Sequence, residues 1–144
     1  MQKISEENQK WFKDAEKDIK NKMSWVSEKS KNKIPYTTVD GEHDNQLETR
    51  PGFWTNGFWG GMMWQMYAAT GEERYCDVAR FSEYQMDQLF TDYFGMDHDV
   101  GFLWLPTAVA DYRITGNEES RKRGLHAANI LAGRYNPKGN FIRA

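Results

Sequence analysis

The chain has 144 residues, of which 39% are hydrophobic and 15% aromatic, and this is enough apolar material for one folded domain with a core. Its 19 basic and 21 acidic residues give a net charge of −2, which argues against binding to nucleic acid or anionic lipid through net charge. A single cysteine, Cys76, excludes an intrachain disulfide framework.

The start of the chain is polar and charged, without the apolar core of a signal peptide. No run approaches the roughly 20 apolar residues that a membrane helix needs. Motifs for phosphate, dinucleotide, esterase and zinc-ribbon chemistry are also missing from the sequence. We therefore predict a cytoplasmic protein with no cofactor and with neither nucleic acid nor a membrane as partner.

Apolar residues spaced by three or four predict an amphipathic first helix over residues 6–30. These residues are Trp11, Ala15, Ile19, Met23 and Val26. Ser5 is placed to cap the start of this helix, and Pro35 ends the pattern. Turn-forming residues without periodicity follow over 35–56, and a connection this long is often functional. We interpret His43, which is alone in this connection, as a surface residue.

Bulky rings and glycines alternate in residues 53–61, FWTNGFWGG. Two interpretations are open. The glycines could let a helix pack tightly on its neighbour, or the rings could form an aromatic platform at the rim of a pocket, which would favour a carbohydrate ligand.

The pattern Tyr67, Thr70, Gly71, Glu73 recurs about 45 positions later as Tyr112, Thr115, Gly116 and Glu118. It predicts helix pairs at about 57–92 and 101–135, with Thr-Gly stops inside each pair and the start of a third repeat at 139. In the first pair the predicted buried face of the second helix is Tyr75, Val78, Ala79, Ser82, Met86 and Leu89. In the second pair the predicted buried residues are Leu105, Val109 and Tyr112, then Leu125, Ala128, Leu131 and Tyr135.

Two carboxylates and an imidazole lie together between these pairs, in Asp97, His98 and Asp99. Imidazole and carboxylate can bind a divalent metal, but three adjacent residues on regular structure cannot all face one ion, so we predict no metal. A carboxylate beside an aromatic pocket could act in acid/base chemistry. The structural alternative is that Asp99 caps the following helix, and from residue chemistry alone this is the commoner use.

Five segments, in order and spacing, resemble the unsaturated glucuronyl hydrolases, glycoside hydrolase family 88. They are 54–59 (WTNGFW), 70–72 (TGE), 97–102 (DHDVGF), 112–116 (YRITG) and 139–144 (GNFIRA). The unsaturated rhamnogalacturonyl hydrolases are a weaker match, because the tryptophan-rich segment is closer to the first family.

The resemblance implies an all-α fold of helical hairpins in an (α/α)6 six-hairpin barrel, with residues 1–144 as the N-terminal portion of its single domain. Six units at this period need roughly 270 residues, so we expect a truncated barrel. Faces that bear Trp59, Trp64, Phe102 and Trp104 would then be exposed, and self-association through exposed apolar surface is expected.

The resemblance also implies a glycoside hydrolase that removes a 4,5-unsaturated uronic acid from the non-reducing end of oligosaccharides, beginning with hydration of the vinyl ether double bond. Asp99 maps onto one of two functional carboxylates. Trp54 maps onto a sugar-contacting aromatic residue and His98 onto a neighbour of the site; Asn56 is also expected to bind substrate. The second carboxylate is expected just beyond Ala144. A helical-repeat module that binds carbohydrate or acts as a scaffold without catalysis remains the alternative.

Overall fold

The computed structural model describes residues 4–93 and 95–143. Residue 144, which ends the last of the five segments above, lies outside the described residues, as do residues 1–3 and 94. The protein is 67% helical, so the predicted all-α class is confirmed. The elements in chain order are α1 (Glu6–Lys29), β1 (Thr38–Val39), β2 (Glu42–His43), α2 (Gln46–Thr49), α3 (Asn56–Thr70), α4 (Glu73–Gln85), α5 (Gln88–Asp92), α6 (Val100–Trp104), the π-helix η1 (Leu105–Val109), α7 (Ala110–Thr115), α8 (Glu118–Gly133), β3 (Tyr135–Asn136) and β4 (Phe141–Ile142).

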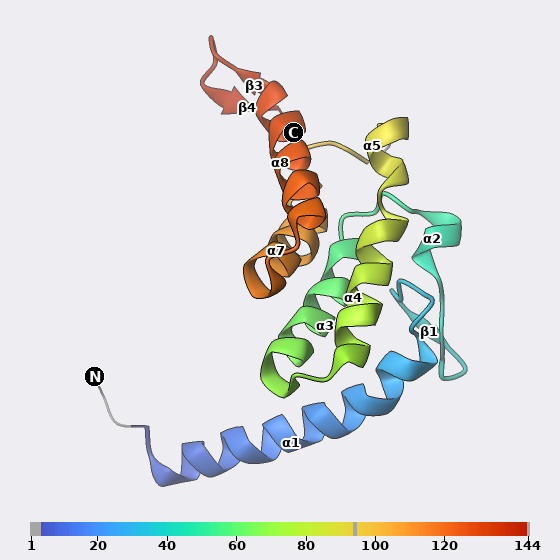
Figure 1. The fold of residues 1–144 in the computed structure, drawn as a ribbon, viewed down its shortest axis with the longest axis vertical. Coiled ribbons are helices and arrows are strands. Elements are labelled where there is room, and N and C mark those ends of the chain that lie inside the picture. Colours follow the sequence, from blue (N-terminus) through green and yellow to red (C-terminus); the bar gives the residue numbers. More distant parts are fainter. Residues whose placement is uncertain (1–3, 94, 144) are drawn as a thin grey trace.

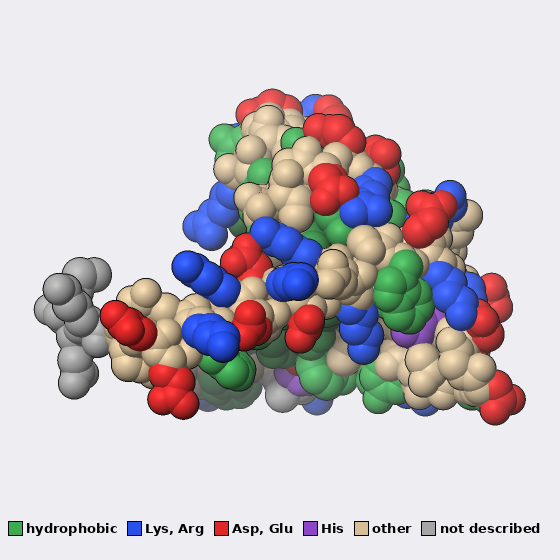
Figure 2. All heavy atoms as spheres, turned by 90° about the horizontal axis from the view of Figure 1, so that it is seen from below, with side chains coloured by type: hydrophobic (Ala, Val, Ile, Leu, Met, Phe, Trp, Pro, Cys, Tyr) green, Lys and Arg blue, Asp and Glu red, His purple; other side chains and the backbone are tan. Residues whose placement is uncertain are grey.

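Helix α1 begins at the predicted cap, where the Ser5 hydroxyl accepts a hydrogen bond from the N–H of Asn8. It runs beneath α3 and α4 as a long arm (Figure 1). Val26 is buried, but Trp11 is 64% exposed and Ile19 is 56% exposed. The predicted apolar stripe therefore forms, yet only its C-terminal end contacts the core. Basic and acidic side chains alternate along this helix (Figure 2), so no patch of one sign develops there.

Helices α3 and α4 form an antiparallel pair, side by side in Figure 1. Gly71, with φ of 71°, ends α3 as predicted. All six residues of the predicted buried face of the second helix are buried, from Tyr75 to Leu89. Trp59, Trp64 and Trp104 are 4% exposed or less. The expectation that these tryptophans would be exposed is wrong, because the two helix pairs already enclose them.

The second pair departs from the predicted faces. Its first helix is interrupted by η1, a wide turn that contains Pro106, which cannot donate a backbone hydrogen bond. Leu105 is 61% exposed and Tyr112 is 38% exposed, so the prediction is wrong for these two residues, while Val109 is half-buried. The residues that point inward are Leu103, Trp104, Thr107, Ala108 and Asp111.

The predicted face of α8 is wrong for a related reason. Its buried residues are small or polar: Ser120, Gly124 and Ala127. Leu125 is 52% exposed, Ala128 and Tyr135 are also exposed, and Leu131 is only partly buried. A Cβ atom at Gly124 would lie 2.9 Å from Cγ2 of Val109, so a small residue is what allows α8 to approach η1. Apolar periodicity marks leucines and cannot detect this packing.

Two short hairpins complete the described chain. Strands β1 and β2 pair antiparallel across a turn in which Asp40 and Gly41 both have positive φ. Strands β3 and β4 pair antiparallel across a turn after α8. None of the described helices has both the length and the apolar content needed to cross a membrane.

Candidate functional site

The turn before α3 carries Trp54 and is fixed from below by Asn56. The Nδ2 atom of Asn56 donates to the carbonyl oxygens of Arg50 at 2.9 Å and Pro51 at 2.8 Å. Asn56 is 1% exposed, and its Oδ1 atom has no hydrogen-bond partner among the described residues. The structure thus places this predicted substrate-binding residue under the surface, where it holds the turn that presents Trp54.

Three exposed rings from separate elements meet above this turn. The centroid of Trp54 lies 5.6 Å from that of Phe58 and 5.6 Å from that of Phe102, in edge-to-face arrangements. The Phe58 and Phe102 centroids are 6.0 Å apart. Each ring is between 40% and 48% exposed. Trp59 of the 53–61 segment is part of the core, while Trp54 and Phe58 are exposed in a ring cluster; that this cluster binds carbohydrate stays a prediction.

Two glycines bring the elements that carry these rings together. A Cβ atom at Gly57 would lie 2.2 Å from the carbonyl oxygen of Phe102, so only glycine lets α3 approach α6 this closely. At Gly95, which has φ of 69°, a Cβ atom would lie 2.5 Å from the carbonyl oxygen of Gly52. The turn before Trp54 and the loop before Asp99 therefore lie against each other.

The acidic loop itself is non-helical and partly exposed. Asp99 occupies the N-cap position of α6, but its side chain makes no capping hydrogen bond. The carboxylate lies 3.5 Å from Nε2 of His98. Oδ1 of Asp97 accepts a hydrogen bond from the backbone N–H of Asp99 at 2.9 Å and lies 3.9 Å from Nδ1 of His98. The structural alternative for Asp99, a side-chain cap, is therefore not observed.

Asp97, His98 and Asp99 could share a cation, because one ligand atom from each lies within 4.8 Å of the others. The argument that adjacent residues cannot face one ion fails here, since the loop is not regular structure. Carboxylate oxygen and imidazole nitrogen would suit a divalent ion, with water completing its coordination. That the protein uses no metal stays a prediction.

A cleft of about 570 Å³ lies elsewhere, between α1, the 35–38 segment and α3. Phe58 lines it as well as belonging to the ring cluster, but none of the three residues of the acidic loop does. We place the candidate site at the loop, because two carboxylates and an imidazole lie together there. His43, interpreted from the sequence as a surface residue, is instead partly buried and lines this cleft, with its Nδ1 atom 2.7 Å from the hydroxyl oxygen of Ser30.

Sequence reasoning missed that Phe102 joins Trp54 and Phe58 in this ring cluster, although the Gly-Phe pair at 57–58 and 101–102 could have indicated it. It also missed Asp97 as the residue that fixes the backbone of Asp99. The spacing Asp-X-Asp, typical of an Asx turn, could have indicated it.

Comparison with known proteins shows what these features resemble. The unsaturated chondroitin disaccharide hydrolase of Streptococcus pneumoniae (strain ATCC BAA-255 / R6) is 37% identical over 92 residues, which cover 63% of this chain and 23% of that protein. The chain is homologous to the unsaturated glucuronyl hydrolases. The resemblance predicted from the sequence is thereby confirmed. No family model matches the chain.

Solved unsaturated glucuronyl hydrolases share its fold. An aspartate-to-asparagine variant with the oligosaccharide dGlcA-Glc-Rha-Glc matches with a TM-score of 0.74 and 27% identity, over 85% of this chain and 32% of that one. The enzyme of Bacillus sp. GL1 matches with a TM-score of 0.72 and 28% identity, over 83% and 31%. These neighbours confirm helical hairpins of an (α/α)6 barrel. The chain spans about a quarter of the length of the curated relatives and a third of these structures.

Proposed function

We propose that this chain belongs to a glycoside hydrolase that removes a 4,5-unsaturated uronic acid from the non-reducing end of an oligosaccharide. The observation that carries the proposal is the Asp99 carboxylate, which is not used as a helix cap and belongs to a loop packed against the turn of Trp54. The support from relatives is that the chain is homologous to unsaturated glucuronyl hydrolases, one of which was solved with an unsaturated oligosaccharide.

The chemistry of this substrate suits such a site. A vinyl ether accepts a proton at C4, which places positive charge on C5 and the ring oxygen, and water then adds at C5. The resulting hemiketal opens and releases the remaining sugar. A carboxylate near C5 stabilises the developing cation and orients the water. We assign this role to Asp99, stacking of the sugar ring to Trp54, and a contact at the edge of the site to His98. Proton delivery to C4 is assigned to a carboxylate beyond the described residues.

The test is Asp99→Asn in the full-length protein, assayed by the loss of ultraviolet absorbance of the double bond in an unsaturated disaccharide. Because asparagine keeps the size and removes the charge, we expect turnover to fall by about 100-fold or more with an unchanged melting temperature. Asp40→Asn, in the exposed β1–β2 turn, is the matched control and should keep full activity. Near-normal turnover of Asp99→Asn, or a loss only in proportion to lost folding, would show that Asp99 is structural.

Two further expectations belong to this proposal. A cytoplasmic location is supported by the single, buried cysteine. Self-association is supported by apolar side chains exposed on α1, where Trp11 is 64% and Phe12 is 54% exposed. Sedimentation velocity should show association that the double change Trp11→Ser and Phe12→Ser reduces; a monomer at every concentration would contradict it.

A further inference from the structure

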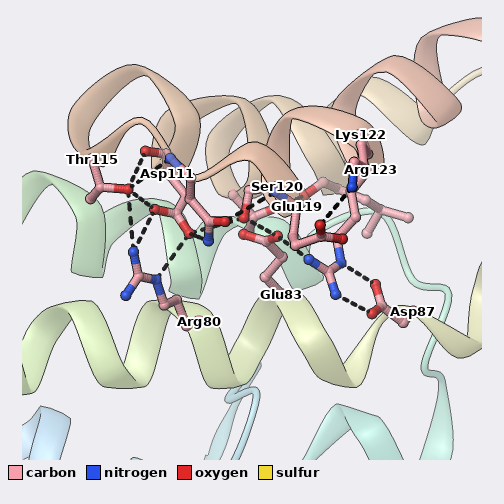
Figure 3. A network of polar contacts seen from close by, with 12 residues as sticks. Arg80, Glu83, Asp87, Asp111, Thr115, Glu119, Ser120, Lys122 and Arg123 are labelled. Atoms are coloured by element: carbon pink, nitrogen blue, oxygen red, sulfur yellow. Dashed lines mark hydrogen bonds and ion pairs between the residues drawn. The ribbon is translucent and has the colours of Figure 1, made fainter.

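A buried carboxyl group, Glu83, lies where the two helix pairs meet, away from the candidate site. Its side chain projects from α4 toward α7 and α8 (Figure 3) and is 0% exposed. Its Oε1 atom lies 2.6 Å from the hydroxyl oxygen of Ser120, while its Oε2 atom is buried with no hydrogen-bond partner among the described residues. A buried carboxylate with one unpaired oxygen is costly, so the state of this group requires explanation.

The hydroxyl of Ser120 contacts two carboxyl groups at once. Its oxygen lies 2.6 Å from Oε1 of Glu83 and 2.9 Å from Oδ2 of Asp111. A serine hydroxyl carries one hydrogen and can donate to only one of them. If both carboxyl groups were ionised, one of these short contacts would join two oxygens with no hydrogen between them.

Of Glu83 and Asp111, Asp111 is the carboxyl group whose surroundings stabilise the ionised form. Arg80 donates to both of its oxygens, at 3.0 Å and 3.1 Å, and Thr115 and Asn117 donate as well. Burial raises the pKa of Asp111, but these hydrogen bonds outweigh it and hold the pKa below its ordinary value. Both short contacts of Ser120 contain a hydrogen if Glu83 is protonated. Glu83 then donates its hydrogen to the Ser120 hydroxyl, and Ser120 donates its own hydrogen to Asp111.

The charges around Glu83 also favour its neutral form. The groups that face Glu83 are Asp111 from α7, Arg123 from α8, and Arg80 and Asp87 from α4 and its C-terminal turn. Helix α3, which also packs on α4, has no charged residue. Arg80 pairs with Asp111 and Arg123 with Asp87, so the charges balance while Glu83 is neutral. An ionised Glu83 would add an uncompensated negative charge, with Arg123 Nη1 3.5 Å away as its nearest cation.

We propose that Glu83 is a neutral carboxylic acid in the folded protein, and that its proton docks α4 onto α7 and α8, so that this joint between helix pairs weakens when the proton is lost. Desolvation, reinforced by Asp111, raises the pKa of Glu83 to about 7 against the opposing effects of Ser120 and Arg123. The loss therefore falls near physiological pH. The joint responds to pH through a group that the proposed reaction does not use.

The sign of the effect follows from proton linkage. The folded state binds the Glu83 proton more tightly than the unfolded state, in which the pKa is near 4.5. The stabilisation is complete below about pH 4.5 and is lost as the pH rises through about 7. The opposite trend, an increase in stability over this interval, would contradict the proposal.

The test compares the wild-type chain with Glu83→Gln, whose amide can donate to Ser120 without titrating. Between about pH 5 and pH 8 we expect the wild-type melting temperature to fall by about 5 °C or more relative to the variant. Glu73→Gln, an exposed glutamate in the same helix, is the control and should follow the wild type. Parallel curves for wild type and Glu83→Gln would overturn the proposal.

A second measurement needs no variant and so does not depend on whether Glu83→Gln folds. Carbon-13 NMR of the side-chain carboxyl carbons should show one glutamate that titrates near neutral pH. If every glutamate titrates in the ordinary range, Glu83 is ionised in the folded chain and the proposal fails.

Discussion

The carboxylate of Asp97 accepts the backbone N–H of Asp99 at 2.9 Å, and the side chain of Asp99 makes no such bond to the helix that follows it. The two aspartates therefore have different roles. Asp97 fixes the backbone of the loop, while the carboxylate of Asp99 stays available next to His98, 3.5 Å away.

Removal of the Asp97 carboxylate should therefore disturb the loop and, through it, Asp99. We expect Asp97→Ala to lower stability by about 1 kcal/mol and to lower turnover by about 10-fold, because the proposed group is no longer held in position. Asp97→Asn keeps an oxygen that accepts the same N–H and should retain most of both. Thermal unfolding and a disaccharide assay on the full-length protein measure the two effects. Equal activity of the wild type and Asp97→Ala would show that Asp97 does not position Asp99 for the reaction.

Helices α3 and α6 approach each other closely at Gly57, so a methyl group added at this residue should lower the stability of the fold. Because a Cβ atom there would lie 2.2 Å from a backbone oxygen of α6, Gly57→Ala should cost about 2–4 kcal/mol and displace the ring cluster. Gly133→Ala, in open space at the end of α8, should leave stability unchanged within about 0.5 kcal/mol. Chemical denaturation compares them, and equal midpoints would show that α3 can shift without cost.

The ion pair between Arg80 and Asp111 predicts that the stability cost of Arg80→Ala depends on pH. Asp111 is 0% exposed, so Arg80→Ala leaves a buried charge without its cation and should cost about 3 kcal/mol at neutral pH. The pKa of Asp111 is lowered by its donors, so its contribution is present above the unfolded value near 3.8 and is lost as the pH falls through the lower folded pKa. The deficit of Arg80→Ala should therefore shrink below about pH 3.8.

Denaturation midpoints from about pH 2 to pH 7 test this dependence. The control is Arg121→Ala, which removes an exposed ion pair to Glu118 and should change stability by less than about 1 kcal/mol at any pH. A constant deficit of Arg80→Ala down to low pH would show that packing, rather than charge, is what Arg80 supplies.

Cys76 should be unreactive in the folded chain. It is 2% exposed, and burial raises the pKa of its thiol, so both access and the thiolate fraction are low. A thiol reagent should label it at least 100-fold more slowly in native buffer than in denaturant. Rapid labelling of the native chain would show that the α3–α4 pair opens readily.

Local sequence rules were sufficient wherever a feature depends on neighbours along the chain. The Ser5 cap and the glycine stops at 71 and 116 formed as predicted. The buried face of α4 also followed from its apolar spacing. These features involve contacts within a few residues, so the side chains that decide them are visible in a short stretch of sequence.

What only the tertiary structure decided is which faces are covered and which polar groups meet. The inward faces of η1, α7 and α8 carry Thr107, Asp111 and Ser120, and apolar periodicity does not predict a polar face as buried. The burial of Asp111 and Ser120 is tolerated because Arg80 and Glu83, from a different helix, form hydrogen bonds with them. In the same way the sequence pointed to Asp99, but only the fold showed that its carboxylate does not cap the helix, since that depends on which oxygen atoms the N–H groups of the loop donate to.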